Sequence, residues 1–229
     1  AFRTSLYAPD RLVISAAGAV DEDELLALAE ACFGGAEGAG AELPEPGVFV
    51  GGQASEARRL EQVHLVLMLP APGAMDADYF TLRLFVEALG GGMASRLFQE
   101  AREKRGLAYA VDAYADTYSY VGALGVYAGC AAKDVEPLIE LIQKVLGELS
   151  SSPLEAELER AKAQFMTSLF LNHEGAASRC GTFASQLSTF GKVFTLDEVA
   201  ADIEAVSRDD LVRVGSAVAM QKACASALL

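Results

Sequence analysis

The chain has 229 residues, of which 52% are hydrophobic and 22% charged, which is typical of a globular protein with a sizeable core. Its formal net charge of −14 argues against nucleic-acid binding, since that affinity depends on neutralising phosphates with Lys and Arg. No apolar run approaches the roughly 20 residues that a membrane-spanning helix needs, and no signal-peptide pattern opens the chain. The sequence begins without Met, which predicts a processed or truncated polypeptide.

The histidines and cysteines show no metal-binding spacing. His64 lies in an apolar run and His173 near the end of a long helix, and neither belongs to an H-E-x-x-H or H-x-x-E-H motif. The sequence therefore predicts no metal site in this chain. No pair of the cysteines has C-x-x-C spacing. They are expected to be small buried side chains in a reducing compartment, and a disulfide in an oxidising compartment is the alternative. The cysteines are Cys32, Cys130, Cys180 and Cys224.

The opening of the chain predicts a strand, a helix and a linker. Residues 11–17 (RLVISAA) favour a strand. Asp21, three residues before Glu24, predicts the N-cap of a helix that ends near Phe33. Residues 34–53 are rich in Gly, Pro, Ala and Glu, and such a segment cannot bury enough apolar surface to order itself. We therefore predict the end of an N-terminal domain, a linker and a C-terminal domain at residues 1–33, 34–53 and 54–229.

The predicted C-terminal domain mixes strands and helices in an irregular order. The apolar run 63–69 is typical of a strand covered on both faces, and the alternating runs 107–116 and 120–130 predict a hairpin. Apolar spacing and capping residues predict the remaining elements: helices over 76–89, 135–149 and 175–190, a long helix opened by a capping box at Ser152-Pro-Leu-Glu155, short helices opened at Thr195 and Ser207, and a strand over 222–229. This order indicates an α+β fold, a two-layer domain with helices packed on a mostly antiparallel sheet.

The segment 90–109, GGGMASRLFQEAREKRGLAY, is the centre of this domain. The glycines Gly90, Gly91 and Gly92 end one helix and precede a short second helix. They lack the lysine and the spacing of a phosphate-binding loop, so a hinge or a close backbone approach explains them better than anion binding does.

The short helix after the glycines is expected to be amphipathic. Its predicted apolar stripe is Met93, Leu97 and Ala101, whereas its polar residues face away: Arg96, Glu100, Glu103 and Lys104.

Arg102, in the short helix, and Tyr109, in the following strand, meet at one junction of the chain. One interpretation is a solvated arginine and a half-buried tyrosine. The other is a polar pair that holds a carbonyl or carboxylate through charge-assisted hydrogen bonds.

The run GGGMASRLFQEAREKRGLAYAV, followed by YVGALGVYAGC, resembles the second homologous domain of the pitrilysin and mitochondrial-processing-peptidase family. Members of this family are zinc peptidases with an inverted H-x-x-E-H motif. The opening YAPDRLVISAAGAVDEDELLALAEACFG is similar to the end of that family's first domain. The resemblance implies two similar α+β domains that close around an unfolded peptide, with an N-terminal zinc-binding domain or a partner subunit, in a dimer. A cytoplasmic or periplasmic location is expected rather than the mitochondrial matrix.

The resemblance also implies roles for individual residues. The family's second domain supplies an Arg and, seven residues later, a Tyr that contact the substrate backbone and the transition state, and Arg102 and Tyr109 have this spacing. The glycines 90–92 correspond to a stretch tied to substrate handling.

The family's zinc ligands and catalytic glutamate lie in the first domain and are absent here. The chain is then either the C-terminal, substrate-binding half of a zinc metalloendopeptidase or a non-catalytic, peptide-binding partner subunit. Both interpretations predict zinc only in the intact parent protein, and no peptide hydrolysis by this chain alone.

Overall fold

The computed structural model describes residues 7–36, 38, 45–221 and 225–228. The chain divides into two compact units: Ala1–Pro46 with Ser168–Thr195, and Gly47–Thr167 with Leu196–Leu229. The domain boundaries expected near residues 33 and 53 stay a prediction.

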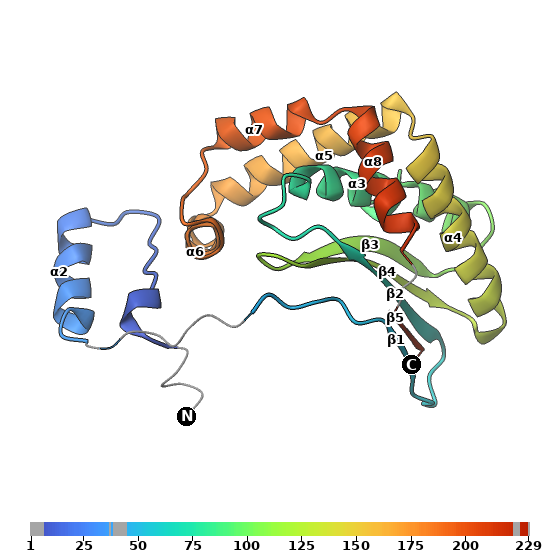
Figure 1. The fold of residues 1–229 in the computed structure, drawn as a ribbon, viewed down its shortest axis with the longest axis horizontal. Helices are drawn as coiled ribbons and strands as arrows, with labels where there is room; N and C mark the ends of the chain where they lie inside the picture. Colours follow the sequence, from blue (N-terminus) through green and yellow to red (C-terminus); the bar gives the residue numbers. More distant parts are fainter. Residues whose placement is uncertain (1–6, 37, 39–44, 222–224, 229) are drawn as a thin grey trace. The chain divides into compact units, whose positions relative to one another are not determined.

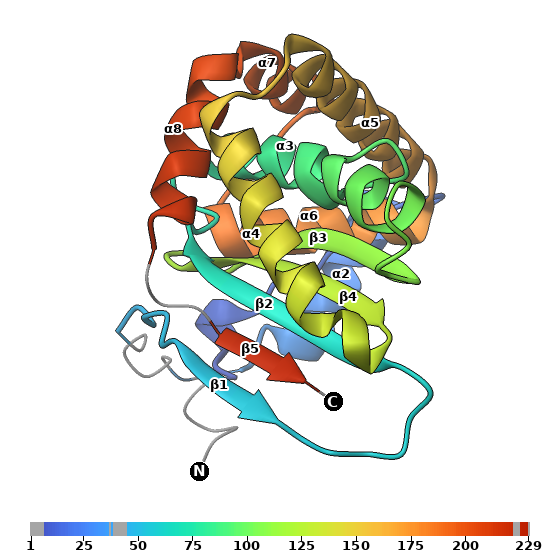
Figure 2. The same cartoon turned by 90° about the vertical axis from the view of Figure 1, so that its right-hand side faces the viewer.

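The second unit contains a mixed sheet in the strand order β1-β5-β2-β4-β3 (Figures 1 and 2). Among the described strands, only the pair β1–β5 is parallel. β2 pairs antiparallel with β4 from Val63 opposite Cys130 to Ala71 opposite Gly122. The predicted hairpin and the mostly antiparallel sheet are confirmed. The strands are β1 (Gly52–Ser55), β2 (Val63–Ala71), β3 (Ala110–Thr117), β4 (Gly122–Cys130) and β5 (Ala225–Leu228).

The helices of this unit cover one face of the sheet, as Figure 1 shows, which confirms the two-layer α+β fold. The core between the layers includes Leu65, Phe85 and Leu124, all fully buried. These helices are α3 (Tyr79–Gly90), α4 (Val135–Ser151), α7 (Leu196–Ala205) and α8 (Arg208–Ala219), together with the first part of α5 (Glu155–Glu174).

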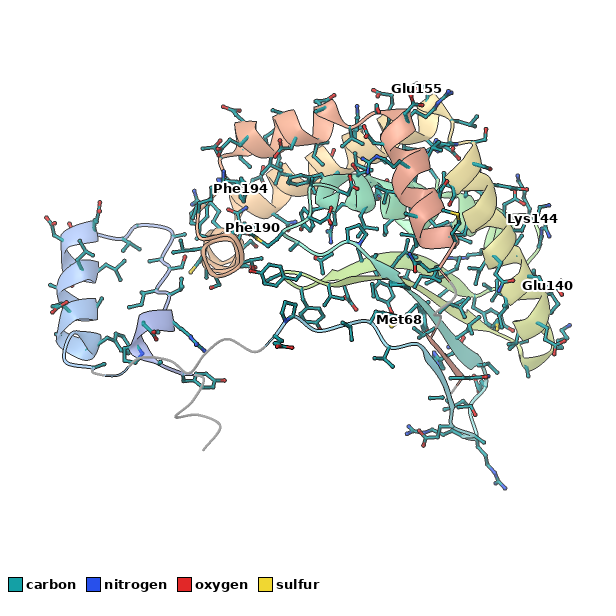
Figure 3. The ribbon with its side chains drawn as sticks, viewed as in Figure 1. Met68, Glu140, Lys144, Glu155, Phe190 and Phe194 are labelled. Atoms are coloured by element: carbon teal, nitrogen blue, oxygen red, sulfur yellow. The ribbon has the colours of Figure 1, made fainter. Side chains whose placement is uncertain are left out.

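Helix α4 shows why the helical predictions succeed. Its apolar residues recur every three or four positions and are buried, for example Leu138, Ile142 and Leu149. Glu140 and Lys144 project from its outer side, away from the sheet (Figure 3). Burial of one apolar stripe therefore fixes the orientation of this helix on the sheet.

The prediction that β2 is covered on both faces is wrong. Leu65 is its only buried residue, and the other positions are half-buried. The continuous apolar run indicated two covered faces, but the helices of this unit lie on one face alone. Met68 lies on the other face of the sheet (Figure 3).

The first unit contains η1 (Pro9–Arg11), α2 (Glu22–Phe33) and α6 (Ala176–Phe190). Asp21 accepts a hydrogen bond from the Glu24 N–H at 2.9 Å, so the predicted N-cap is confirmed. The predicted strand over 11–17 is wrong, because within the described residues no strand lies beside it to complete a ladder. Near α6, the rings of Phe190 and Phe194 meet edge to face at 5.2 Å (Figure 3).

The cysteines follow the prediction only in part. Cys130 is buried and Cys180 half-buried, but Cys32 is exposed on α2; Cys224 lies outside the described residues. In the part of the chain that the structure describes, no helix has both the length and the apolar character that crossing a membrane requires.

Candidate functional site

The triple glycine forms the turn that follows α3. Gly90 is buried, and a Cβ there would overlap the backbone nitrogen of Ala113 in β3. Gly90 is therefore glycine because helix and strand approach closely. The carbonyl of Gly91 accepts a hydrogen bond from Gln164 Nε2 at 2.7 Å, and the carbonyl of Gly92 accepts one from Ser95 Oγ at 2.6 Å.

The turn leads into η2 (Phe98–Glu103), a short π-helix in which the Lys104 N–H donates to the Gln99 carbonyl five residues back at 3.0 Å. Single π-helical turns occur frequently at functional sites. Leu97 and Ala101 are fully buried, as predicted. Met93 is 74% exposed, so its place in the apolar stripe is wrong: it lies in the turn before the helix, where the four-residue spacing does not apply.

Arg102 projects from η2 with its side chain 47% exposed. Its guanidinium carbon lies 4.9 Å from the centroid of the Phe98 ring, and its Nε lies 3.9 Å from Glu103 Oε1. The ring holds the guanidinium by a cation–π contact, whereas the exposed ion pair contributes little.

Tyr109 lies immediately before β3. Its backbone N–H donates to the Gly129 carbonyl at 2.8 Å, which fixes its main chain to the neighbouring strand. The residue is 63% exposed, more than the half-buried tyrosine of the first interpretation. Arg102 and Tyr109 are thus solvent-facing residues on consecutive elements, and their functional roles stay a prediction.

Arg96 does not face away from the domain as expected: its side chain is only 18% exposed. Its Nε donates to Glu157 Oε1 at 2.5 Å and its Nη2 to Glu157 Oε2 at 2.7 Å. Nη2 also donates to the Ser152 carbonyl at 2.9 Å. No local sequence signal reveals this pair, because its members are far apart in the chain.

Glu157 also corrects the predicted start of the long helix. Helix α5 begins at Glu155, so the predicted capping box at Ser152-Pro-Leu-Glu155 is wrong. Instead, Glu157 accepts the Leu154 N–H at 2.8 Å. Burial raises the pKa of Glu157, but hydrogen bonds from Arg96 and the Leu154 N–H outweigh it and lower the pKa overall. The carboxylate therefore stays ionised against Arg96.

A second carboxylate, Glu87, lies under the glycine turn and was not predicted. A Cβ on Gly91 would overlap its carboxylate, and its Oε1 is buried without a hydrogen-bond partner. Burial raises the pKa of Glu87, although the charge of Arg83 opposes this rise.

The described residues do not fit a zinc ion, since no three of their His, Cys, Asp or Glu side chains are placed to share one. His64 Nδ1 lies 2.8 Å from the Tyr127 hydroxyl, in hydrogen-bond range, and the His173 ring packs edge to face on Phe183 at 5.9 Å.

A family model described as the peptidase M16 inactive domain matches residues 1–165. An uncharacterized zinc protease of Streptomyces coelicolor is 32% identical over 219 residues, covering 90% of this chain and 47% of the relative. The uncharacterized zinc protease YmxG of Bacillus subtilis is 35% identical over 206 residues, covering 88% of this chain and 49% of the relative. The chain therefore spans about half the length of the curated relatives it matches.

Solved structures show the same fold. A protease from Helicobacter pylori superposes with a TM-score of 0.79 at 20% identity, covering 93% of this chain and 54% of that chain. A peptidase M16 inactive domain from Pseudomonas fluorescens superposes with a TM-score of 0.75 at 20% identity, covering 91% of this chain and 51% of that chain. Because the family model matches most of the chain, the chain belongs to the peptidase M16 family, in the part described as its inactive domain.

Proposed function

We propose that this chain is the C-terminal, substrate-binding half of a zinc metalloendopeptidase that cleaves unfolded peptides in a closed chamber. The observation that carries the proposal is the exposed pair Arg102 and Tyr109, on η2 and just before β3, within the segment that resembles the family. The curated relatives that are named zinc proteases are about twice as long as the matched region, which leaves room for a zinc-binding half.

The chemistry of the pair suits a peptide substrate. The guanidinium of Arg102 is always charged and can donate several hydrogen bonds to a peptide carbonyl. The Tyr109 hydroxyl can donate to the oxygen on which negative charge develops during peptide cleavage. Since Phe98 supports one side of the guanidinium at 4.9 Å, the arginine reaches solvent already partly ordered.

The glycine turn is the second part of the proposed substrate site. Gly91 and Gly92 are half-buried, whereas Gly90 is closed off against β3. The proposed contribution of this stretch to peptide binding therefore rests on Gly91 and Gly92.

The proposed partners are a peptide substrate and an N-terminal zinc-binding domain or a partner subunit, in a dimer. In this proposal the zinc ion belongs to that other half and not to this chain. We place the protein in the cytoplasm or the periplasm, by analogy with its bacterial relatives.

Peptide hydrolysis by the full-length protease tests the proposal. Arg102→Ala and Tyr109→Phe should each lower kcat/KM by about 100-fold, the effect of losing one oxyanion donor. Arg105→Ala is the matched control, because Arg105 is a neighbouring arginine with 45% of its side chain exposed. This variant should keep kcat/KM within about twofold of the unsubstituted protease, because its ion pair with Glu100 contributes little energy.

The alternative is a non-catalytic partner subunit that binds peptide. The description of the matching family model as an inactive domain is compatible with it. A full-length protein that binds peptides without cleaving them, and pairs with an active subunit, would decide for this alternative.

A further inference from the structure

Helix α5 holds the segment that leads to Arg102 at two points. Glu157 binds the side chain of Arg96, and Gln164 Nε2 donates to the Gly91 carbonyl at 2.7 Å. Glu157 and Gln164 stand seven positions apart on α5, which is about two helical turns and places them on the same face. One face of α5 therefore fixes both ends of the stretch from Gly91 to Arg96.

The contact between Arg96 and Glu157 is bidentate and largely shielded from water. The side chains are 18% and 8% exposed, respectively. Two parallel N–H···O bonds fix the plane of the guanidinium as well as its position. A third bond, from Nη2 to the Ser152 carbonyl at 2.9 Å, ties the same group to the turn before α5.

Because Arg96 lies two residues before η2, fixing its side chain also limits where η2 can lie. Arg96 is followed by Leu97, and Leu97 and Ala101 are both fully buried. The Leu107 N–H donates to the Ala101 carbonyl at 2.8 Å, which closes the other end of η2. Arg102 therefore follows residues that are anchored on both sides.

We propose that Arg96, Glu157 and Gln164 are positioning residues that hold the glycine turn and η2 on α5, so that Arg102 is presented to the substrate. This inference rests on the proposed function of Arg102. Apolar side chains in place of a buried ion pair often preserve stability, so stability alone does not require this pair. Its fixed geometry orients the segment that follows.

Kinetics of the full-length protease with a peptide substrate test the inference. The variants are R96K, which keeps the charge but loses the planar fork, and the double variant R96M/E157L. The double variant replaces both charged groups with apolar side chains, a change that often preserves stability, although it also removes the acceptor of the Leu154 N–H. Each should lower kcat by about 10- to 100-fold, the effect of a misplaced catalytic group, with KM within about twofold. The control E100Q weakens the ion pair of Glu100, inside η2, with the exposed Lys104 and should leave kcat unchanged.

A double-mutant cycle with R102A separates positioning from general damage. If Arg96 acts through Arg102, then R96K should cause no further loss of kcat in the R102A background. Two results would overturn the inference: a loss of kcat from R96K that multiplies with the loss from R102A, or a kcat of R96K equal to that of the unsubstituted protease.

Hydrogen exchange of the same full-length variants gives a readout independent of catalysis. Amides within residues 94–107 should exchange at least about tenfold faster in R96M/E157L, while the sheet amides keep their rates. If R102A does not change kcat, the proposed role of Arg102 fails, and exchange alone decides the positioning: unchanged rates in 94–107 overturn it.

Discussion

Gly90 and Gly147 are helical glycines in different surroundings. A Cβ at Gly90 would overlap the backbone of Ala113, whereas one at Gly147, exposed on α4, would meet nothing within 4 Å. Gly90→Ala should therefore lower the free energy of unfolding by about 1–3 kcal/mol through overpacking. Gly147→Ala should raise it by about 1 kcal/mol, because alanine favours the helix more than glycine does. Urea denaturation of both variants measures the difference.

The same two variants test whether close packing alone explains the glycine at position 90. If Gly90→Ala unfolds at the same urea concentration as the parent chain, the close approach of α3 to β3 is not the reason for this glycine.

Residue-scale patterns predicted the candidate site only in part. Local spacing identified Leu97 and Ala101 as buried, and the family resemblance singled out Arg102 and Tyr109, which are exposed. Local spacing placed Arg96 on the outside and missed its inward-facing side chain, because its partner Glu157 belongs to another helix. A charged residue in an amphipathic pattern is expected on the surface, and only tertiary structure shows that a partner carboxylate holds it inside.

Helix α8 gives a prediction at the scale of an element. Its predicted capping residue is confirmed: the Asp210 N–H donates to Ser207 Oγ at 3.3 Å, and Asp210 Oδ2 accepts the Ser207 N–H at 3.0 Å. Ser207→Ala should lower the free energy of unfolding by about 1 kcal/mol, because one end of the helix loses its cap. Fraying of this helix end would also loosen the packing of Leu211 and Val214, which are both buried.

Urea denaturation at neutral pH measures this loss, with Ser168→Ala, an exposed serine inside α5, as the control. The control should stay within about 0.5 kcal/mol. Hydrogen bonds from Ser207 and Arg213 lower the pKa of Asp210 from 3.8 to about 2, so the cap's contribution is lost as the pH falls through this interval. A Ser207→Ala effect that instead grew as the pH falls from 3.8 to 2 would contradict this account.

Elements with their own periodicity or caps were predictable from the sequence. Helices α3, α4 and α8 and the β3–β4 hairpin follow from apolar spacing and capping residues, with shifts of a few residues at their ends. Strand β1 was not predicted: its sequence, GQAS, has no β-branched residue, and it forms by pairing with β5 at the far end of the chain. Residues 12–17 show the converse, because strand-forming side chains make no strand without a neighbouring ladder.

At the scale of the whole molecule, composition and charge excluded classes of function but gave no fold. The linker composition and the family resemblance predict a two-domain organisation, which stays a prediction, whereas the family model over residues 1–165 confirms the family. The two compact units do not follow sequence order, since Ser168–Thr195 joins the N-terminal unit. Contacts between distant segments decide such a division, and no local pattern reports them.

The response to zinc and EDTA should differ between this chain and the full-length protein. The described residues offer no cluster of three ligands, so zinc and EDTA should each leave the melting temperature and circular dichroism of this chain unchanged. If the proposed function is right, the full-length protein should lose peptide hydrolysis in EDTA and regain it with added zinc, because the proposal assigns the zinc ligands to the other half. Calorimetry with and without one equivalent of zinc makes the comparison. A rise in the melting temperature of this chain with zinc would reveal a site within it, since a ligand that binds only the folded state stabilises that state.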